Sequence, residues 1–193
     1  MTEYILWADV ETTGLDYHRD NLLEIAAVVT NKSATEEYGT FESVIYYSEF
    51  EAKIIRTRAV DFVRNMHDNT GLWDRLPEGE NISSVDLGLY DFIFSLSPEP
   101  RKTRLAGNSV RLDLNFMEEN LPVTYSHLHY RSIDVSALAY TLSDCWGVVD
   151  GYFRKEKKHT AIDDIRESIA EYRWLKAQLD TIAEKAWRYD SLD

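Results

Sequence analysis

The sequence predicts an α/β fold in which a mixed β-sheet is flanked by helices. Three apolar runs in the first 50 residues have the length and composition of strands: Tyr4 to Val10, Leu22 to Thr30 and Phe41 to Tyr47. Short connections that include Asn31-Lys32-Ser33 and Gly39 separate these runs, which favours antiparallel pairing of the three strands. Helix-like and strand-like segments then alternate, as expected where helices cover the faces of a sheet.

Six further elements are expected before the C-terminal helix. Ser83 and Asp86 have the spacing of a capping box, and Ser136 is a favourable N-cap residue. The expected helices are Val60 to His67, a segment from Ser83 or Ser84 to before Pro98, Val110 to Glu119 and Ser136 to Leu142; the expected strands are Thr103 to Ala106 and Arg131 to Val135.

The last helix has the clearest pattern. Its apolar residues recur every three or four positions, which is typical of an amphipathic helix that packs on a core. These residues are Ile165, Ile169, Tyr172, Leu175, Leu179, Ile182 and Ala186.

Composition limits the kind of protein. A length of 193 residues predicts a single domain, residues 1–193. The lone cysteine, Cys145, excludes an intrachain disulfide and a cysteine-rich zinc site, and it fits a reducing compartment. The first apolar run is too short to cross a membrane and lacks the basic flank of a signal peptide. We therefore expect a soluble, cytoplasmic protein without a membrane partner.

The net charge of −13 argues against a partner that is long duplex nucleic acid. Proteins that hold long nucleic acid present basic surfaces, because each neutralised phosphate releases counterions. A short substrate carries few phosphates, and bound cations would reverse the local charge where it reacts.

Asp9 and Glu11 follow the first apolar run two residues apart. On a strand, this spacing places both carboxylates on one face, where they repel each other unless a cation lies between them. A hard cation such as Mg²⁺ is the natural partner. The alternative is a solvated strand end with two unrelated acids.

Asp113 lies on the apolar stripe of an expected helix. Val110, Leu114 and Met117 form that stripe, and a carboxylate among them is costly unless it is paired or binds a metal. The alternative is a salt bridge to Arg111, Arg101 or Arg104.

His159 immediately precedes the last helix, and two acids compete to lie beside it. Five helical residues turn about 500°, so His159 and Asp164 converge only if the histidine lies in the loop and the acid in the first turn. Asp163 is the competing choice from geometry. Either acid also complements the helix dipole, and a loop histidine is usually just exposed.

Together, Asp9, Glu11, Asp113 and Asp164 offer the acidic oxygens that two Mg²⁺ or Mn²⁺ ions require. His159 offers a base with an ordinary pKa of about 6.5. This combination predicts phosphodiester hydrolysis by metal-activated water.

These residues, in this order, resemble the DEDDh family of 3′→5′ exonucleases, and the nearer resemblance is to its oligoribonucleases. The resemblance covers nearly the whole chain. The segments that carry it are residues 7–16, residues 106–110 leading to Asp113, residues 130–136, residues 159–171, and Met66-His67 with Gly71-Leu72.

The resemblance implies an RNase-H-like fold, a homodimer, and degradation of very short single-stranded RNA to mononucleotides. It assigns two divalent cations, Mg²⁺ or Mn²⁺, to Asp9, Glu11, Asp113 and Asp164, and so selects Asp164 over Asp163. It assigns the general base to His159.

The resemblance also implies substrate contacts. Leu15 would wedge between two bases, with His67 stacked nearby and Phe62 at the position of the family's base-stacking tryptophan. Ser109, Tyr130, Arg131 and Ser136 would cap the terminal 5′ phosphate, the tyrosine reaching across from the other subunit.

Two departures from oligoribonucleases bear on substrate length. Thr12 stands where methionine is usual, which gives the Glu-Thr-Thr-Gly form of proofreading-type relatives, and Phe62 replaces the tryptophan. A broader exonuclease that trims single-stranded DNA or RNA is therefore an alternative. A catalytically silent nucleic-acid-binding module is an alternative of another class.

Overall fold

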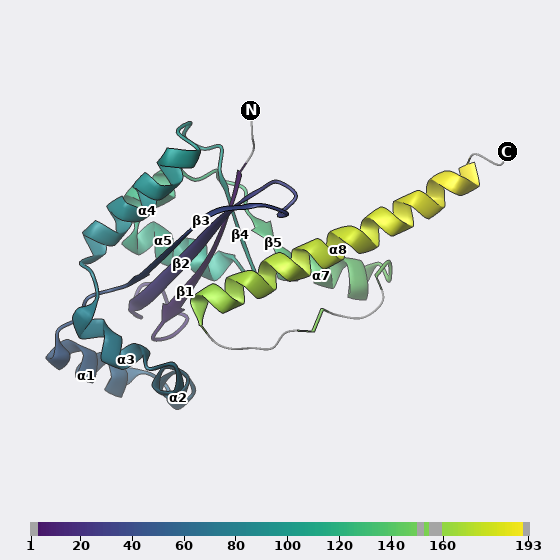
Figure 1. The fold of residues 1–193 in the computed structure, drawn as a ribbon. Helices are drawn as coiled ribbons and strands as arrows, with labels where there is room; N and C mark the ends of the chain where they lie inside the picture. Colours follow the sequence, from purple (N-terminus) through teal and green to yellow (C-terminus); the bar gives the residue numbers. More distant parts are fainter. Residues whose placement is uncertain (1–3, 150–152, 155–159, 191–193) are drawn as a thin grey trace.

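The computed structural model describes residues 4–149, 153–154 and 160–190. Its sheet has five strands in the order β3-β2-β1-β4-β5 (Figure 1). The first three pair antiparallel, and β4 and β5 join parallel to β1, so the predicted mixed sheet is confirmed. The strands are β1 (Tyr4–Thr12), β2 (Leu22–Asn31), β3 (Glu37–Val44), β4 (Arg104–Gly107) and β5 (Ile133–Asp134).

The helices occupy both faces and one end of this sheet. They are α1 (Glu49–Arg58), α2 (Asp61–Thr70), α3 (Leu72–Arg75), α4 (Ile82–Leu96), α5 (Arg111–Asn120), α6 (Pro122–His127), α7 (Val135–Tyr140) and α8 (Ala161–Asp190); a 3-10 turn (Leu76–Glu78) and a π-helical turn (Thr141–Cys145) complete the described elements.

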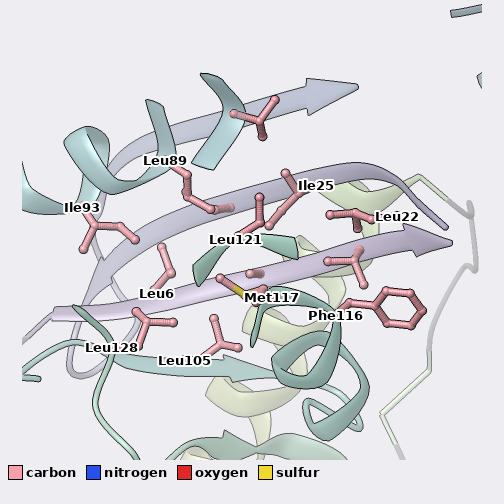
Figure 2. Close-up of a cluster of buried hydrophobic side chains, with 14 of the residues drawn as sticks. Leu6, Leu22, Ile25, Leu89, Ile93, Leu105, Phe116, Met117, Leu121 and Leu128 are labelled. Carbon is pink, nitrogen blue, oxygen red and sulfur yellow. The ribbon is translucent and has the colours of Figure 1, made fainter. Parts of the chain in front are cut away.

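The side chains of β1 alternate between two cores. Leu6, Ala8 and Val10 belong to a core shared with α4 and α5, part of which Figure 2 shows. Ile5 and Trp7 face the opposite way, into a core shared with α7 and α8. Because Asp9 and Glu11 continue the Ile5–Trp7 side of the strand, they face α8.

The predicted stripe of α8 packs as expected over its first half. Ile165, Ile169 and Leu175 are buried against the sheet, with Tyr172 and Leu179 partly buried beside them. The C-terminal part of the helix extends beyond the sheet (Figure 1). Within the parts of the chain that the structure describes, no helix combines the length and the apolar character needed to cross a membrane.

Several predicted boundaries were wrong for identifiable reasons. Gly39 lies inside β3 rather than in a turn, where a Cβ atom would come within 2.9 Å of the Phe92 ring. Asn81, not Ser83, caps α4, because its side chain accepts from the Ser83 backbone N–H. Similarly, Asp134 caps α7 by accepting from Ala137 N, which starts that helix before Ser136 and leaves β5 only two residues.

Helix α1 was not predicted, although its N-terminus carries a capping box. The Ser48 side chain accepts from Glu51 N, and Glu51 accepts in return from Ser48 N. With α2 and α3, this helix forms a small third core near the end of β1. Helix α2 of this group places His67 next to Glu11 at the end of β1.

Candidate active site

Three carboxylates from β1 and α8 converge. Asp9, Glu11 and Asp164 each offer one oxygen, and these oxygens all lie within 4.8 Å of one another. Asp9 and Glu11 share a face of β1, as their spacing predicted. Asp164 lies in the first turn of α8, which the buried Ile165 anchors on the sheet.

Asp113 extends the cluster from α5. Asp113 is 5% exposed, and its Oδ1 accepts a 3.1 Å hydrogen bond from the backbone N–H of Val10, between the two β1 acids. Its charge acts directly on Asp9. The alternative of an arginine salt bridge finds no support in residues 4–149, where the Asp113 carboxylate is held by backbone donors.

Asp163 has a different partner. The Thr160 hydroxyl donates to its Oδ2 at 2.8 Å, and Asp163 N lies 3.4 Å from the same hydroxyl, so both residues cap the start of α8. Since Asp163 is occupied at the helix end, Asp164 is the acid that α8 contributes to the cluster.

Burial and mutual repulsion make these carboxylates difficult to ionise. Burial is the main cause that raises the pKa of Asp9 well above its ordinary value, followed by the charges of Asp113 and Glu11. Burial, then the charges of Asp164 and Glu24, raises the pKa of Glu11 to about 8. Burial raises the pKa of Asp113 to about 7. Such a set is stable in its charged form when cations offset the charge, and its all-oxygen donors fit hard divalent ions.

An ion pair lies beside this cluster. Glu24 on β2 is the register partner of Glu11 and is 7% exposed. Arg75 of α3 donates to both its carboxylate oxygens, at 2.8 and 3.2 Å. The Arg75 charge also acts to lower the pKa of Glu11.

His67 is buried next to Glu11 and does not lie on the surface. Its Nε2 is 2.9 Å from the carbonyl oxygen of Thr12; because a carbonyl only accepts, Nε2 is the protonated nitrogen. Its Nδ1 is 3.8 Å from Glu11 Oε2, Trp73 packs against the ring with centroids 5.3 Å apart, and the His67 side chain is 1% exposed. The expected stacking of His67 on a base is corrected, since this structure leaves no ring face open to a substrate.

Leu15 and Phe62 are open to solvent. They are 78% and 73% exposed, so each has an apolar surface available to a base. The loop that carries Leu15 is fixed by Asp20, whose carboxylate accepts from Asp16 N and from the Thr13 hydroxyl.

The expected phosphate contacts fall into two groups. Ser109 is exposed with a φ of 51°, and Ser136 donates to the side chain of its neighbour Asn108. Tyr130 is 72% exposed, stacks on His129 with ring centroids 4.6 Å apart, and lies 5.2 Å from the Arg131 guanidinium. His159 lies outside the described residues.

The exonuclease family model matches residues 6–172, which include all four acids. The chain belongs to the exonuclease family. Curated relatives of this exonuclease agree: it is 33% identical over 176 residues to an oligoribonuclease of Cutibacterium acnes, covering 91% of this chain and 85% of the relative. It is also 33% identical over 186 residues to an oligoribonuclease of Xylella fastidiosa, covering 93% and 91%. A probable oligoribonuclease of Schizosaccharomyces pombe is 32% identical over 168 residues, 86% of this chain and 65% of that one.

Solved structures show the same fold. An exonuclease I superposes with a TM-score of 0.62 at 15% identity, over 97% of this chain. The E. coli exonuclease I in complex with a dT13 oligonucleotide has a TM-score of 0.62 over 96% of this chain. This exonuclease spans only 44% and 43% of the two longer chains. The likeness confirms the RNase-H-like fold predicted from the sequence.

Four residues around the acids of this exonuclease were not predicted from its sequence: Glu24, Arg75, Asn108 and Ser168. Glu24 had one visible signal, a lone charge within an apolar run, which is costly to bury without a partner. The others are revealed only by contacts between segments distant in the sequence.

Proposed function

We propose that this exonuclease is a 3′→5′ exoribonuclease that degrades very short RNA, down to dinucleotides, to 5′-mononucleotides. The observation that carries the proposal is the convergence of Asp9, Glu11 and Asp164 within 4.8 Å, with Asp113 bonded to the strand between the first two. The names of the curated relatives support the substrate class.

The four acids are proposed to hold two divalent cations, Mg²⁺ or Mn²⁺. When bound, such ions supply an activated water and stabilise the charge that develops on the phosphoryl oxygens. The protein fixes the ligand geometry: β1 sets the spacing of Asp9 and Glu11, and the capped start of α8 sets Asp164. His159, one residue before Thr160, is the proposed base that accepts the proton of the attacking water.

The substrate contacts are also proposals. Leu15 and Phe62 would hold bases against their exposed apolar surfaces, which favours stacking without base specificity. Ser109, Ser136 and Arg131 would bind the 5′ phosphate, and the exposed Tyr130 would reach the site of a second subunit in a homodimer. His67 takes no part in stacking in this proposal; it donates to the Thr12 carbonyl oxygen and lies next to Glu11.

The charge of −13 supports a short substrate over long duplex. We further propose that residues 1–193 form one exonuclease domain that works in the cytoplasm.

A broader exonuclease is the second candidate. Glu-Thr-Thr-Gly at residues 11–14 and the fold shared with exonuclease I favour trimming of longer single strands. Purified protein with Mg²⁺ is to be given 5′-labelled RNA of two and seven nucleotides and a seven-nucleotide DNA. The proposal expects the RNA dinucleotide to be cleaved with the highest kcat/KM. Ready trimming of the longer strands without dinucleotide cleavage would support the second candidate, and binding without hydrolysis would support a silent module.

A further inference from the structure

Asn108 joins two serines at the C-terminal end of β4. Its Oδ1 accepts a 3.1 Å hydrogen bond from the hydroxyl of Ser136 in α7. Its Nδ2 donates a 2.9 Å hydrogen bond to the hydroxyl of Ser168 in α8. The amide therefore connects two helices that both pack on the same side of the sheet.

The connection continues to the acid cluster. Ser168 is 5% exposed, and its hydroxyl donates at 2.9 Å to the carbonyl oxygen of Asp164, one turn earlier in α8. A hydroxyl has one hydrogen to give and can also accept, so Ser168 can accept from Asn108 while it donates to Asp164. Three hydrogen bonds thus lead from Ser136 to the residue that carries one of the clustered carboxylates.

The backbone around Asn108 is held in place on both sides. A Cβ atom on Gly107 would come within 3.0 Å of the Ala8 carbonyl oxygen, so β4 approaches β1 closely just before Asp9. Ser109 adopts a φ of 51°, a conformation that most residues avoid. The Asn108 side chain therefore provides a direct hydrogen-bonded connection between Ser136 and Ser168.

We propose that Asn108 and Ser168 are positioning residues that link binding of the substrate's 5′ phosphate at Ser136 to the placement of Asp164. The inference rests on the proposed function, which puts the phosphate at Ser136.

The donors and acceptors in this chain of hydrogen bonds determine how phosphate binding at Ser136 would change the hydrogen bond to Asp164. A phosphate oxygen only accepts, so Ser136 can bind it only by withdrawing its single hydrogen from Asn108. If the Asn108 side-chain amide rotates by half a turn, its Nδ2 donates to Ser136 and its Oδ1 accepts from Ser168. Ser168 then gives up its bond to the Asp164 carbonyl, and the first turn of α8 is held differently when phosphate is bound. Groups that orient metal ligands typically change affinity or rate by about 10- to 100-fold when removed.

The first test compares 5′-phosphorylated and 5′-hydroxyl RNA dinucleotides. In the wild type, kcat is expected to be higher for the phosphorylated substrate. In Asn108→Ala and Ser168→Ala, kcat is expected to become equal for the two substrates, because neither variant can pass a change at Ser136 on to Asp164. KM should still favour the phosphorylated one, because Ser109 and Arg131 are unchanged. Variants that keep the wild-type kcat ratio would overturn the link.

Ser168→Thr and Thr181→Ala are the controls. Threonine keeps a hydroxyl that can bond the carbonyl one turn earlier, so Ser168→Thr should retain the kcat ratio. Thr181 makes the same kind of bond, to Ala177 O at 2.9 Å, farther along α8, and its removal should leave the ratio unchanged. Thermal unfolding in EDTA checks that the variants fold.

A second readout does not need turnover. Titration of Mn²⁺ without substrate should show affinity about tenfold weaker in Ser168→Ala, and unchanged in Ser168→Thr and Thr181→Ala. Wild-type affinity in Ser168→Ala would refute the support of Asp164 by Ser168. If the wild type fails to cleave dinucleotides, the proposed function fails, while the Mn²⁺ titration still decides the role of Ser168.

Discussion

Glu24 lies directly opposite Glu11 in the antiparallel register of β1 and β2. Both residues are 7% exposed, so two buried carboxylates are neighbours at the edge of the acid cluster. Arg75 neutralises Glu24 with a bidentate contact, which leaves Glu11 as the member of the pair available to a cation.

Removal of the arginine should therefore destabilise the fold. Arg75→Met leaves the Glu24 carboxylate unpaired beside Glu11, and we expect the free energy of unfolding in EDTA to fall by about 1–2 kcal/mol. This is less than for a fully buried pair, because Arg75 is 45% exposed. Urea unfolding at pH 7 measures it. The double variant Glu24→Gln with Arg75→Met should recover most of the loss; failure to recover would show that packing of Arg75, not its charge, matters.

The acids should make the metal-free protein less stable as pH rises. Glu11 has a pKa of about 8 in the folded state and Asp113 about 7, both above their unfolded values. The folded state therefore binds more protons, and stability present below pH of about 4 is lost progressively up to pH of about 8. The urea midpoint in EDTA should fall from pH 5 to pH 8. Saturating Mg²⁺ should flatten the trend, and a midpoint in EDTA that rises with pH would contradict it.

Local sequence patterns predicted some of the clustered acids but not the contacts between them. Asp9 and Glu11 were found because a strand repeats every two residues, and Asp113 because a charge interrupted a helical stripe. The pairing of Glu11 with Glu24 depends on strand register, and the contact of Arg75 with Glu24 depends on the docking of α3; no local pattern encodes either.

His67 shows why a local match can mislead. It follows Phe62 by five residues, and five helical residues turn about 500°, which puts the two side chains about 140° apart around α2. When Phe62 faces solvent at 73% exposure, His67 faces the protein and is fully buried. Both residues could not serve the same exposed surface of that helix.

Loss of the exposed apolar contacts should weaken substrate binding without affecting the fold. Leu15→Ala and Phe62→Ala are expected to raise KM for an RNA dinucleotide by about 5- to 100-fold each, the range for loss of one base-stacking contact. Phe50→Ala is the matched control, because Phe50 is 72% exposed on α1 and has no proposed substrate contact. Steady-state kinetics measures KM. An equal rise of KM in Phe50→Ala would mean that removal of any exposed apolar side chain weakens binding, and would contradict specific contacts by Leu15 and Phe62.

The proposed base predicts a pH profile. In the wild type, kcat should fall as pH drops below the pKa of His159 in the complex, near the ordinary value of about 6.5. His159→Ala should lose this limb and about 100-fold or more in kcat, while its Mn²⁺ affinity stays at the wild-type level. Normal turnover by this variant would remove His159 from the mechanism.

Asp9 gives the most direct test of the central claim, that clustered acids use divalent metal to hydrolyse short RNA. The measurement is mononucleotide release from a 5′-phosphorylated RNA dinucleotide as Mg²⁺ is titrated, for the wild type and Asp9→Asn, with melting temperatures recorded alongside. We expect turnover that saturates with Mg²⁺ and stops in EDTA. Asp9→Asn should lose about 100-fold or more, yet melt higher than the wild type in EDTA, because a neutral amide avoids the cost of burying or protonating the Asp9 carboxyl group. Turnover that persists in EDTA, or that survives in Asp9→Asn, would contradict the account.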